Sequence, residues 1–199
     1  PDAQFAELFT DIDPSGNSNE LVVAFPHSRY SSRSGELRLS GVFGDGERRQ
    51  TLQFAARGRM QKRRYGGEDV IDVGPVELGV GRDIAEPDFI FGAQSHDEVK
   101  QETLGAAYGL QWANVGEMSV GVQKTSYSKT VDTPTGALPE SRAKPWLKYA
   151  TATVNANGRL AFYASYTEGL EESPVAPSNA LNRNVAAPAL ETQQYDAGL

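Results

Sequence analysis

Three arginines occupy one face of a segment with alternating residue types, and their charge could attract an anion. Arg57, Arg59 and Arg63 are separated by even numbers of positions, and in an extended strand such residues project from the same face. A row of cations in a wet cavity concentrates anionic ligands. The same row could instead pair with acidic side chains from neighbouring strands or from another domain. The sequence leaves both interpretations open.

No group of residues has the spacing of a catalytic or metal centre. The chain has no cysteine and only two histidines, which excludes thiol catalysis and cysteine-ligated zinc and leaves too few histidines for a histidine-based cluster. Ser126 and Lys129 match the S-x-x-K spacing of some serine hydrolases, but the partner motifs of those enzymes are missing. We therefore predict that the chain is not an enzyme, with no catalytic residue, no metal ligand and no cofactor.

Charge and length limit the classes of protein to which the chain could belong. The 19 basic and 26 acidic residues give a net charge of -7, which argues against a nucleic-acid partner because binding phosphates needs a concentrated basic surface. No run of about 18 apolar residues could form a transmembrane helix. The 199 residues match the usual length of one domain, about 100 to 200 residues.

The elements that would position the arginines are β-strands with one apolar and one polar face. Between Thr103 and Trp112, large apolar residues alternate with glycine, alanine, threonine and glutamine. The same period of two occurs in residues 36–43, 51–60 and 159–167, and more weakly in residues 21–25, 119–125 and 147–154. This pattern predicts an all-β fold built as an antiparallel meander of about eight strands.

Short and long connections alternate along the chain. The short ones contain Gly, Asn and Asp, which tolerate the tight geometry of hairpins, whereas the long ones are polar and rich in proline. The short connections are residues 44–46, 114–116 and 155–158, and the long ones are residues 65–97, 132–144 and 172–191. Every short turn would then lie at one end of the strands, as in an outer-membrane barrel with short periplasmic turns and long extracellular loops.

Strand length and face chemistry favour a membrane barrel over a soluble sandwich. Residues 47–64 continue the alternation for far longer than the usual strand of about 5 or 6 residues. The small and polar faces suit a wet interior better than a dry core. Two alternatives remain: a small porin-like channel that acts alone, and a soluble all-β module that binds carbohydrate through exposed aromatic rings.

A lipid-facing row fixes the direction of the arginines. If Leu52, Phe54 and Met60 face lipid, then Arg57, Arg59 and Arg63 face the lumen, and we take these three arginines as candidate substrate-binding residues. Lys62 and Arg64 would lie on the opposite face near the rim, in contact with lipopolysaccharide phosphates or with solvent.

The C-terminal third resembles a known family. Residues 160–171 read LAFYASYTEGLE, Ala176 and Pro177 follow, and residues 193–199 read QQYDAGL. These segments are similar to barrel strands and a loop of TonB-dependent outer-membrane receptors of the ferric-siderophore type. Asp196 stands where the family usually has Glu.

This resemblance implies a place in the outer membrane of a Gram-negative bacterium and a role in transport. A receptor of this family takes up a ferric siderophore or a similar metal chelate, driven by the TonB complex through a plug domain inside a barrel of about 22 strands. Residues 1–199 would then be a partial barrel of about eight strands, without the plug domain and the remaining strands. Its further partners would be outer-membrane lipid and lipopolysaccharide.

Overall fold

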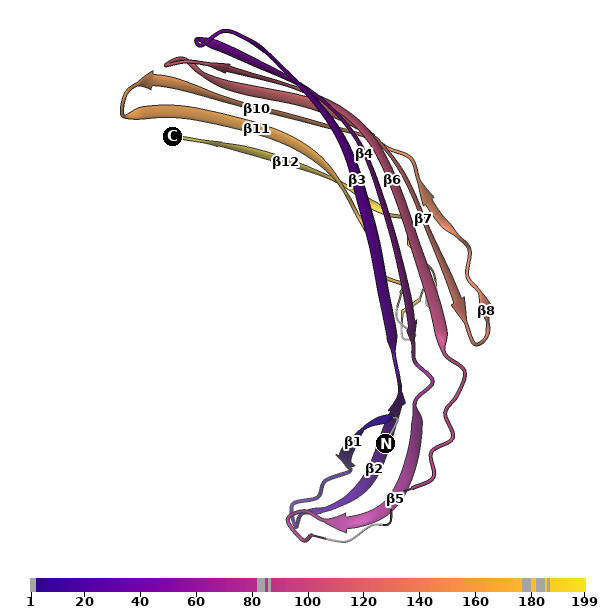
Figure 1. Ribbon diagram of the computed structural model, residues 1–199. Helices are drawn as coiled ribbons and strands as arrows, with labels where there is room; N and C mark the ends of the chain where they lie inside the picture. Colours follow the sequence, from indigo (N-terminus) through magenta and orange to yellow (C-terminus); the bar gives the residue numbers. More distant parts are fainter. Residues whose placement is uncertain (1–2, 82–84, 86, 177–179, 182–184, 186) are drawn as a thin grey trace. The chain divides into compact units, whose positions relative to one another are not determined.

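The fold consists of β-strands joined by turns and loops (Figure 1). The computed structural model describes residues 3–81, 85, 87–176, 180–181, 185 and 187–199. Among these residues no helix is long and apolar enough to cross a membrane. The strands are β1 (Ala3–Thr10), β2 (Asn17–Pro26), β3 (Arg29–Gly44), β4 (Arg48–Tyr65), β5 (Asp69–Glu77), β6 (Ser95–Trp112), β7 (Gly116–Thr133), β8 (Gly136–Ala137), β9 (Ser141–Ala143), β10 (Trp146–Asn157), β11 (Leu160–Glu171) and β12 (Leu190–Gly198).

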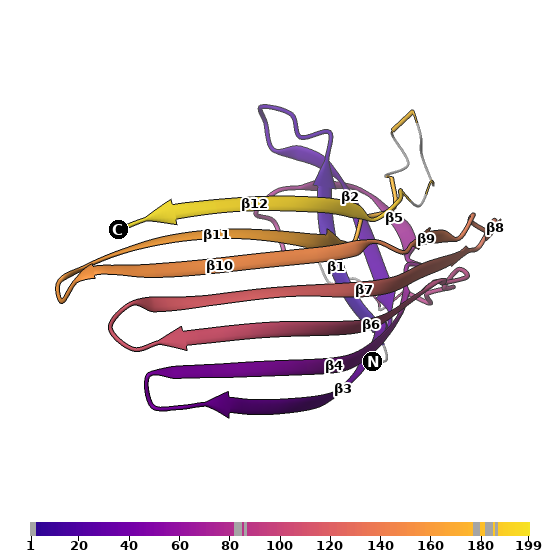
Figure 2. The ribbon, with the colours of Figure 1, turned by 90° about the horizontal axis from the view of Figure 1, so that it is seen from above.

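These strands form two sheets. The larger has the order β12-β11-β10-β7-β6-β4-β3, with β8 and β9 paired to β7, and the smaller has the order β1-β2-β5. Figure 2 shows the long strands of the larger sheet side by side. The order runs along the chain without crossover from β6 to β12 and places the β3–β4 hairpin at one edge. The predicted all-β antiparallel meander is therefore confirmed, as an open sheet with β3 and β12 at its edges.

The described residues fall into two compact units, which we treat separately. The first contains residues 1–31, 62–97 and 132–137, and the second contains residues 32–61, 98–131 and 138–199. In the first unit, the apolar run of β2 supplies the buried side chains Val22, Val23 and Ala24. Gln94 Nε2 donates to the carbonyls of His27 and Gly66, at 3.3 Å each, and so joins residues 1–31 to residues 62–97 within this unit.

Three hairpins of the larger sheet close at the same end of the strands (Figure 2). In the β3–β4 turn, the Asp45 carboxylate accepts the backbone N–H groups of Arg48 and Glu47, at 2.8 and 3.0 Å. These bonds, the one from Arg48 foremost, lower the pKa of Asp45 below its ordinary value. In the β6–β7 turn, Asn114 has a φ of 60°, a left-handed conformation that asparagine tolerates. The short turns are therefore where the sequence predicted them.

The long connections contain more regular structure than their sequences indicate. Residues 65–97 include the whole of β5, and residues 132–144 include β8 and β9. In β5, the register shifts at Val73, because Glu20 of β2 is opposite Gly74 whereas the next residue, Leu21, is opposite Asp72. Such a bulge inserts an extra residue into one strand and hides its periodicity from a sequence reading.

Candidate ligand-binding face

One face of the larger sheet carries a polar hollow. Its volume is about 620 Å³, and strands β3, β4, β6, β7, β10 and β11 contribute to its lining. Arg57 and Arg59 reach it together because they are two positions apart on β4 and so share a face. Among the other lining residues are Glu36, Gln101, Thr103 and Gln123.

Arg57 is held by neighbours on both sides. Its Nη2 donates to Gln123 Oε1 at 2.5 Å, and its Nε lies 3.9 Å from a carboxylate oxygen of Glu36. Glu36 also pairs with Arg38 at 2.5 Å, so its charge is shared between two guanidinium groups. The pairing interpretation of the arginine row therefore holds in part for Arg57, although the contact with Glu36 is long.

Arg59 lines the same hollow but differs from Arg57 in its contacts. Its side chain is exposed, and among the described residues no ion pair or side-chain hydrogen bond engages it. An arginine without a protein partner keeps all five N–H donors available for a ligand. Of the three predicted arginines, Arg59 is thus the one whose guanidinium is free toward the hollow.

Arg63 belongs to the other compact unit and does not line this hollow. Its Nε lies 3.0 Å from both oxygens of Asp97, and its Nη2 lies 2.5 Å from Oδ2. The Asp97 side chain is only 1% exposed, so this pair satisfies a buried carboxylate. Burial raises the pKa of nearby Tyr65, and the Asp97 charge adds to that shift. Arg63 therefore pairs with an acidic side chain, which is the second of the two interpretations of the arginine row.

Two tyrosine rings of the same face lie against glycines of the neighbouring strands. Tyr149 of β10 is opposite Gly121 of β7, and a Cβ atom added to Gly121 would overlap the Tyr149 ring. Tyr163 of β11 has the same relation to Gly198 of β12. The missing glycine side chains leave the space that these rings fill.

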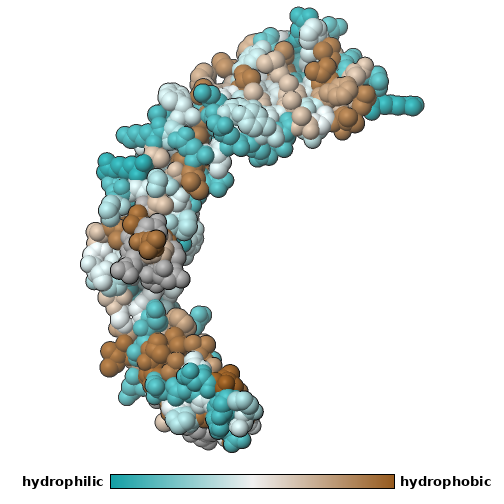
Figure 3. Space-filling model, turned by 180° about the vertical axis from the view of Figure 1, so that it is seen from behind, coloured by the Kyte–Doolittle hydropathy of each residue, from teal (hydrophilic) through white to brown (hydrophobic). Residues whose placement is uncertain are grey.

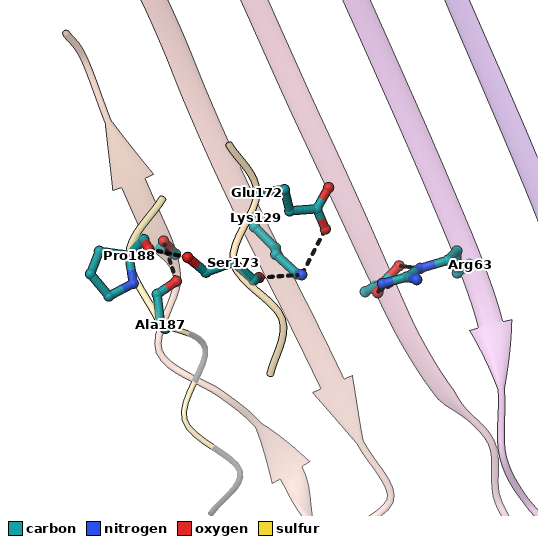
Figure 4. Close-up of polar contacts among 8 residues, drawn as sticks. Arg63, Lys129, Glu172, Ser173, Ala187 and Pro188 are labelled. Carbon is teal, nitrogen blue, oxygen red and sulfur yellow. Dashed lines mark hydrogen bonds and ion pairs between the residues drawn. The ribbon is translucent and has the colours of Figure 1, made fainter. Parts of the chain in front are cut away.

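Beyond the hollow, the polar face becomes buried. Thr125, Tyr127 and Lys129 of β7 are all buried, and Thr125 shares a 3.1 Å hydrogen bond with Thr103 of β6. Lys129 contacts Glu172 and Ser173 (Figure 4). The sequence did not single out these residues for binding, and the S-x-x-K spacing that includes Lys129 gave no hint of this contact.

The opposite face of the larger sheet is apolar and exposed. Leu37 and Leu104 are 76% and 67% exposed, and Figure 3 shows hydrophobic side chains at the molecular surface. Two successive rows across β7, β10, β11 and β12 carry no charge. They consist of Met118, Ala152, Ala164 and Ala197, and of Val120, Ala150, Tyr166 and Tyr195.

On β10 and β11, charged residues begin at one level of this face. In the next row, Lys148 is opposite Val122, and its backbone N–H donates to Glu168 at 2.8 Å. Trp146 lies one row farther, with Lys124 Nζ 5.1 Å from its ring centroid. On β6 the apolar stretch from Leu104 to Trp112 covers nine residues, within the about 9 to 11 that cross a bilayer as a tilted strand.

A meander with short hairpins at one end, one apolar face and one polar face has the features of an outer-membrane barrel wall, here as an open sheet. Comparison with known proteins identifies no matching family model and no matching curated protein. Among solved structures, the chain is similar to BauA, the ferric preacinetobactin receptor from Acinetobacter baumannii. The TM-score is 0.64 at 18% identity, over 97% of this chain and 30% of that receptor. The likeness at this identity is one of fold, and the chain spans 30% of the receptor's length.

Proposed function

We propose that this chain forms part of the wall of an outer-membrane receptor that takes up a ferric siderophore or a similar metal chelate. The observation that carries the proposal is the contrast between the two faces of the larger sheet. One face is apolar and exposed up to the level where Lys148 and Glu168 introduce charge, and the other is polar and hollowed. That arrangement suits a wall between hydrocarbon and water.

Hydrocarbon is the cover that fits the apolar face. Exposed Leu37, Phe54 and Leu104 would be unfavourable in water as a contiguous surface. In a bilayer the same residues are favourable, and the charges at Lys148 and Glu168 would lie at the lipid headgroups. Trp146 and Tyr166 near this level match the aromatic girdle of membrane proteins. Outer-membrane lipid and lipopolysaccharide are therefore proposed partners.

The hollow supports an anionic ligand. Arg59 presents an unpaired guanidinium, and Arg57 adds positive charge that Glu36 only partly offsets at 3.9 Å. Gln101, Thr103 and Gln123 supply neutral hydrogen-bonding groups beside them. Chelates with carboxylate or other oxygen-rich groups would find both charge and donors here. We propose Arg59, supported by Arg57, as the substrate contact on this wall.

Further strands and a plug domain would complete the receptor. The larger sheet has edges at β3 and β12, and open edges expose unpaired backbone groups that a closed barrel satisfies. The similar receptor is more than three times as long as the matched region, since that region is 30% of its chain. In the proposed receptor, a plug domain inside the barrel would receive energy from the TonB complex.

The orientation of the two faces can be tested with adjacent alanines. In the full-length protein in bilayers, a spin label at Ala106→Cys should be relaxed mainly by oxygen, and one at Ala107→Cys mainly by a water-soluble nickel chelate. These residues are neighbours on β6 and point to opposite faces. Equal accessibility of the two labels, or a protein that is monodisperse in buffer without detergent, would contradict the membrane assignment and favour a soluble module.

The transport role can be tested with Arg59. In cells that depend on the full-length protein, Arg59→Glu should reduce ferric-siderophore uptake about tenfold for the substrate identified from a chelate panel. Arg159→Glu, at the far end of the β10–β11 hairpin, makes the same charge change and should leave uptake unchanged. If no chelate in the panel depends on the protein, and the protein conducts ions without TonB, a porin-like channel replaces the receptor.

A further inference from the structure

A buried lysine on the polar face holds one end of the β11–β12 connection. The Lys129 side chain is 1% exposed, and its Nζ donates to Glu172 Oε1 at 2.7 Å and to the Ser173 carbonyl at 3.1 Å (Figure 4). An ammonium group removed from water is stable only when it is paired and hydrogen-bonded. Lys129 therefore depends on the position of residues 172 and 173.

The other end of the same connection is tied at the same place. Ser141 of β9 is paired with Lys129 in the sheet, and its hydroxyl donates to the Ala187 carbonyl at 3.3 Å. The Ser173 hydroxyl donates to the Pro188 carbonyl at 2.6 Å (Figure 4). These bonds bring the two ends of the connection together against β7 and β9, as in the closed neck of an Ω-loop.

We infer that Lys129 is a positioning residue that fixes the two ends of the β11–β12 connection beside the polar hollow. The neck is defined as Glu172, Ser173, Ala187 and Pro188. Its first residue, Glu172, is two positions after Leu170, which lines the hollow together with Gly169. A fixed neck makes these two ends of the connection a constant part of the rim. The inference concerns the architecture of the rim and stands whether or not the ligand is a metal chelate.

The two partners of the ion pair should respond differently to removal. Glu172 has a side chain that is 26% exposed, whereas that of Lys129 is 1% exposed. Glu172→Ala leaves the buried lysine charge without its carboxylate partner, and the neck must open to hydrate that charge. Lys129→Met replaces the ammonium with an apolar group of similar length, while the partly exposed Glu172 can take up water. Glu172→Ala should therefore release the neck more than Lys129→Met.

Hydrogen exchange of the full-length protein in detergent micelles measures this release. Glu172→Ala should speed amide exchange of peptides within residues 171–176 by about tenfold or more, with a smaller change for Lys129→Met. The Ala176 N–H, which donates to the Val185 carbonyl at 3.0 Å, should lose protection in the same variant. Peptides from the β10–β11 hairpin should exchange as in the unchanged protein.

A second variant covers the case in which Glu172→Ala fails to assemble. Ser141→Ala together with Ser173→Ala removes both serine bonds of the neck and leaves Lys129 paired with Glu172. It should speed exchange of the same peptides by a smaller factor. Unchanged exchange in residues 171–176 for the variants that assemble, or equal acceleration across the hairpin peptides, would overturn the inference.

Discussion

Strand β7 shows the same alternation along its length, yet the two ends of its polar face lie in different surroundings. Near the β6–β7 turn, Ser119 and Gln123 are partly exposed, whereas toward the other end Tyr127 and Lys129 are buried. The difference at Lys129 comes from Glu172 and Ser173, which are more than 40 positions away. A period of two therefore fixes the direction of a side chain, but not what covers it.

The largest expected change in the free energy of unfolding comes from placing the same charge in the buried part and in the open part of the polar face. Val99 and Gln101 are two positions apart on β6, but Val99 is 1% exposed and Gln101 lines the open hollow. Val99→Asp should lower the free energy of unfolding by about 4 kcal/mol because it buries an unpaired charge. Gln101→Asp, near Arg57 and Arg59, should change it by less than about 0.5 kcal/mol. Thermal unfolding of the full-length protein in micelles measures both, and equal losses would show that the hollow is not open.

A smaller loss of stability is expected when an arginine is placed on the apolar face, and it can be compared with an arginine placed on the polar face. Phe54 lies in the apolar row of β4 and is exposed, whereas Gln53 lines the polar face. Phe54→Arg should cost about 2 to 3 kcal/mol if that row meets the centre of a bilayer. Gln53→Arg should cost little because its face is wet. Folding titrations into lipid vesicles give both values, and a Phe54→Arg protein as stable as Gln53→Arg would remove the lipid interpretation.

The smallest effect concerns packing at the open end. Gly121 lies beneath the Tyr149 ring, whereas a Cβ at Gly109 would meet only the Met118 carbonyl, at 3.8 Å. Gly121→Ala should lower the free energy of unfolding by about 1 to 2 kcal/mol because the ring must move. Gly109→Ala should be close to neutral. Thermal unfolding again compares the two variants, and identical melting temperatures would mean that the ring is not held over the glycine.

The features that the sequence predicted are those that depend on neighbouring residues. Leu52 and Phe54 against Gln53, and the glycine and asparagine turns, determine faces and hairpins locally. The predicted site was only partly assembled by the structure. Arg57 and Arg59 share the hollow, and Arg63 instead pairs with Asp97, 34 positions away.

Other features could not be predicted because they depend on distant partners. Nothing local to Lys129 indicates that Glu172 reaches it across 43 positions. Strand β5 was hidden by the bulge at Val73, and β1 depends on pairing with β2. The contribution of Gln123 to the hollow could have been predicted, because it is two positions from Gly121 on β7 and therefore lies on the same face.

The tyrosine rings over Gly121 and Gly198 also restrict sliding of the strands. A shift of β10 by two residues along β7 would keep every side chain on its own face, so the alternation alone would not oppose it. Such a shift would place Tyr149 opposite Ser119 or Gln123, whose side chains occupy the space that glycine leaves empty. A slip of β11 by two residues along β12 would likewise place Tyr163 opposite Asp196. Each ring thus fits only opposite its own glycine, which opposes a slip of the paired strands past one another.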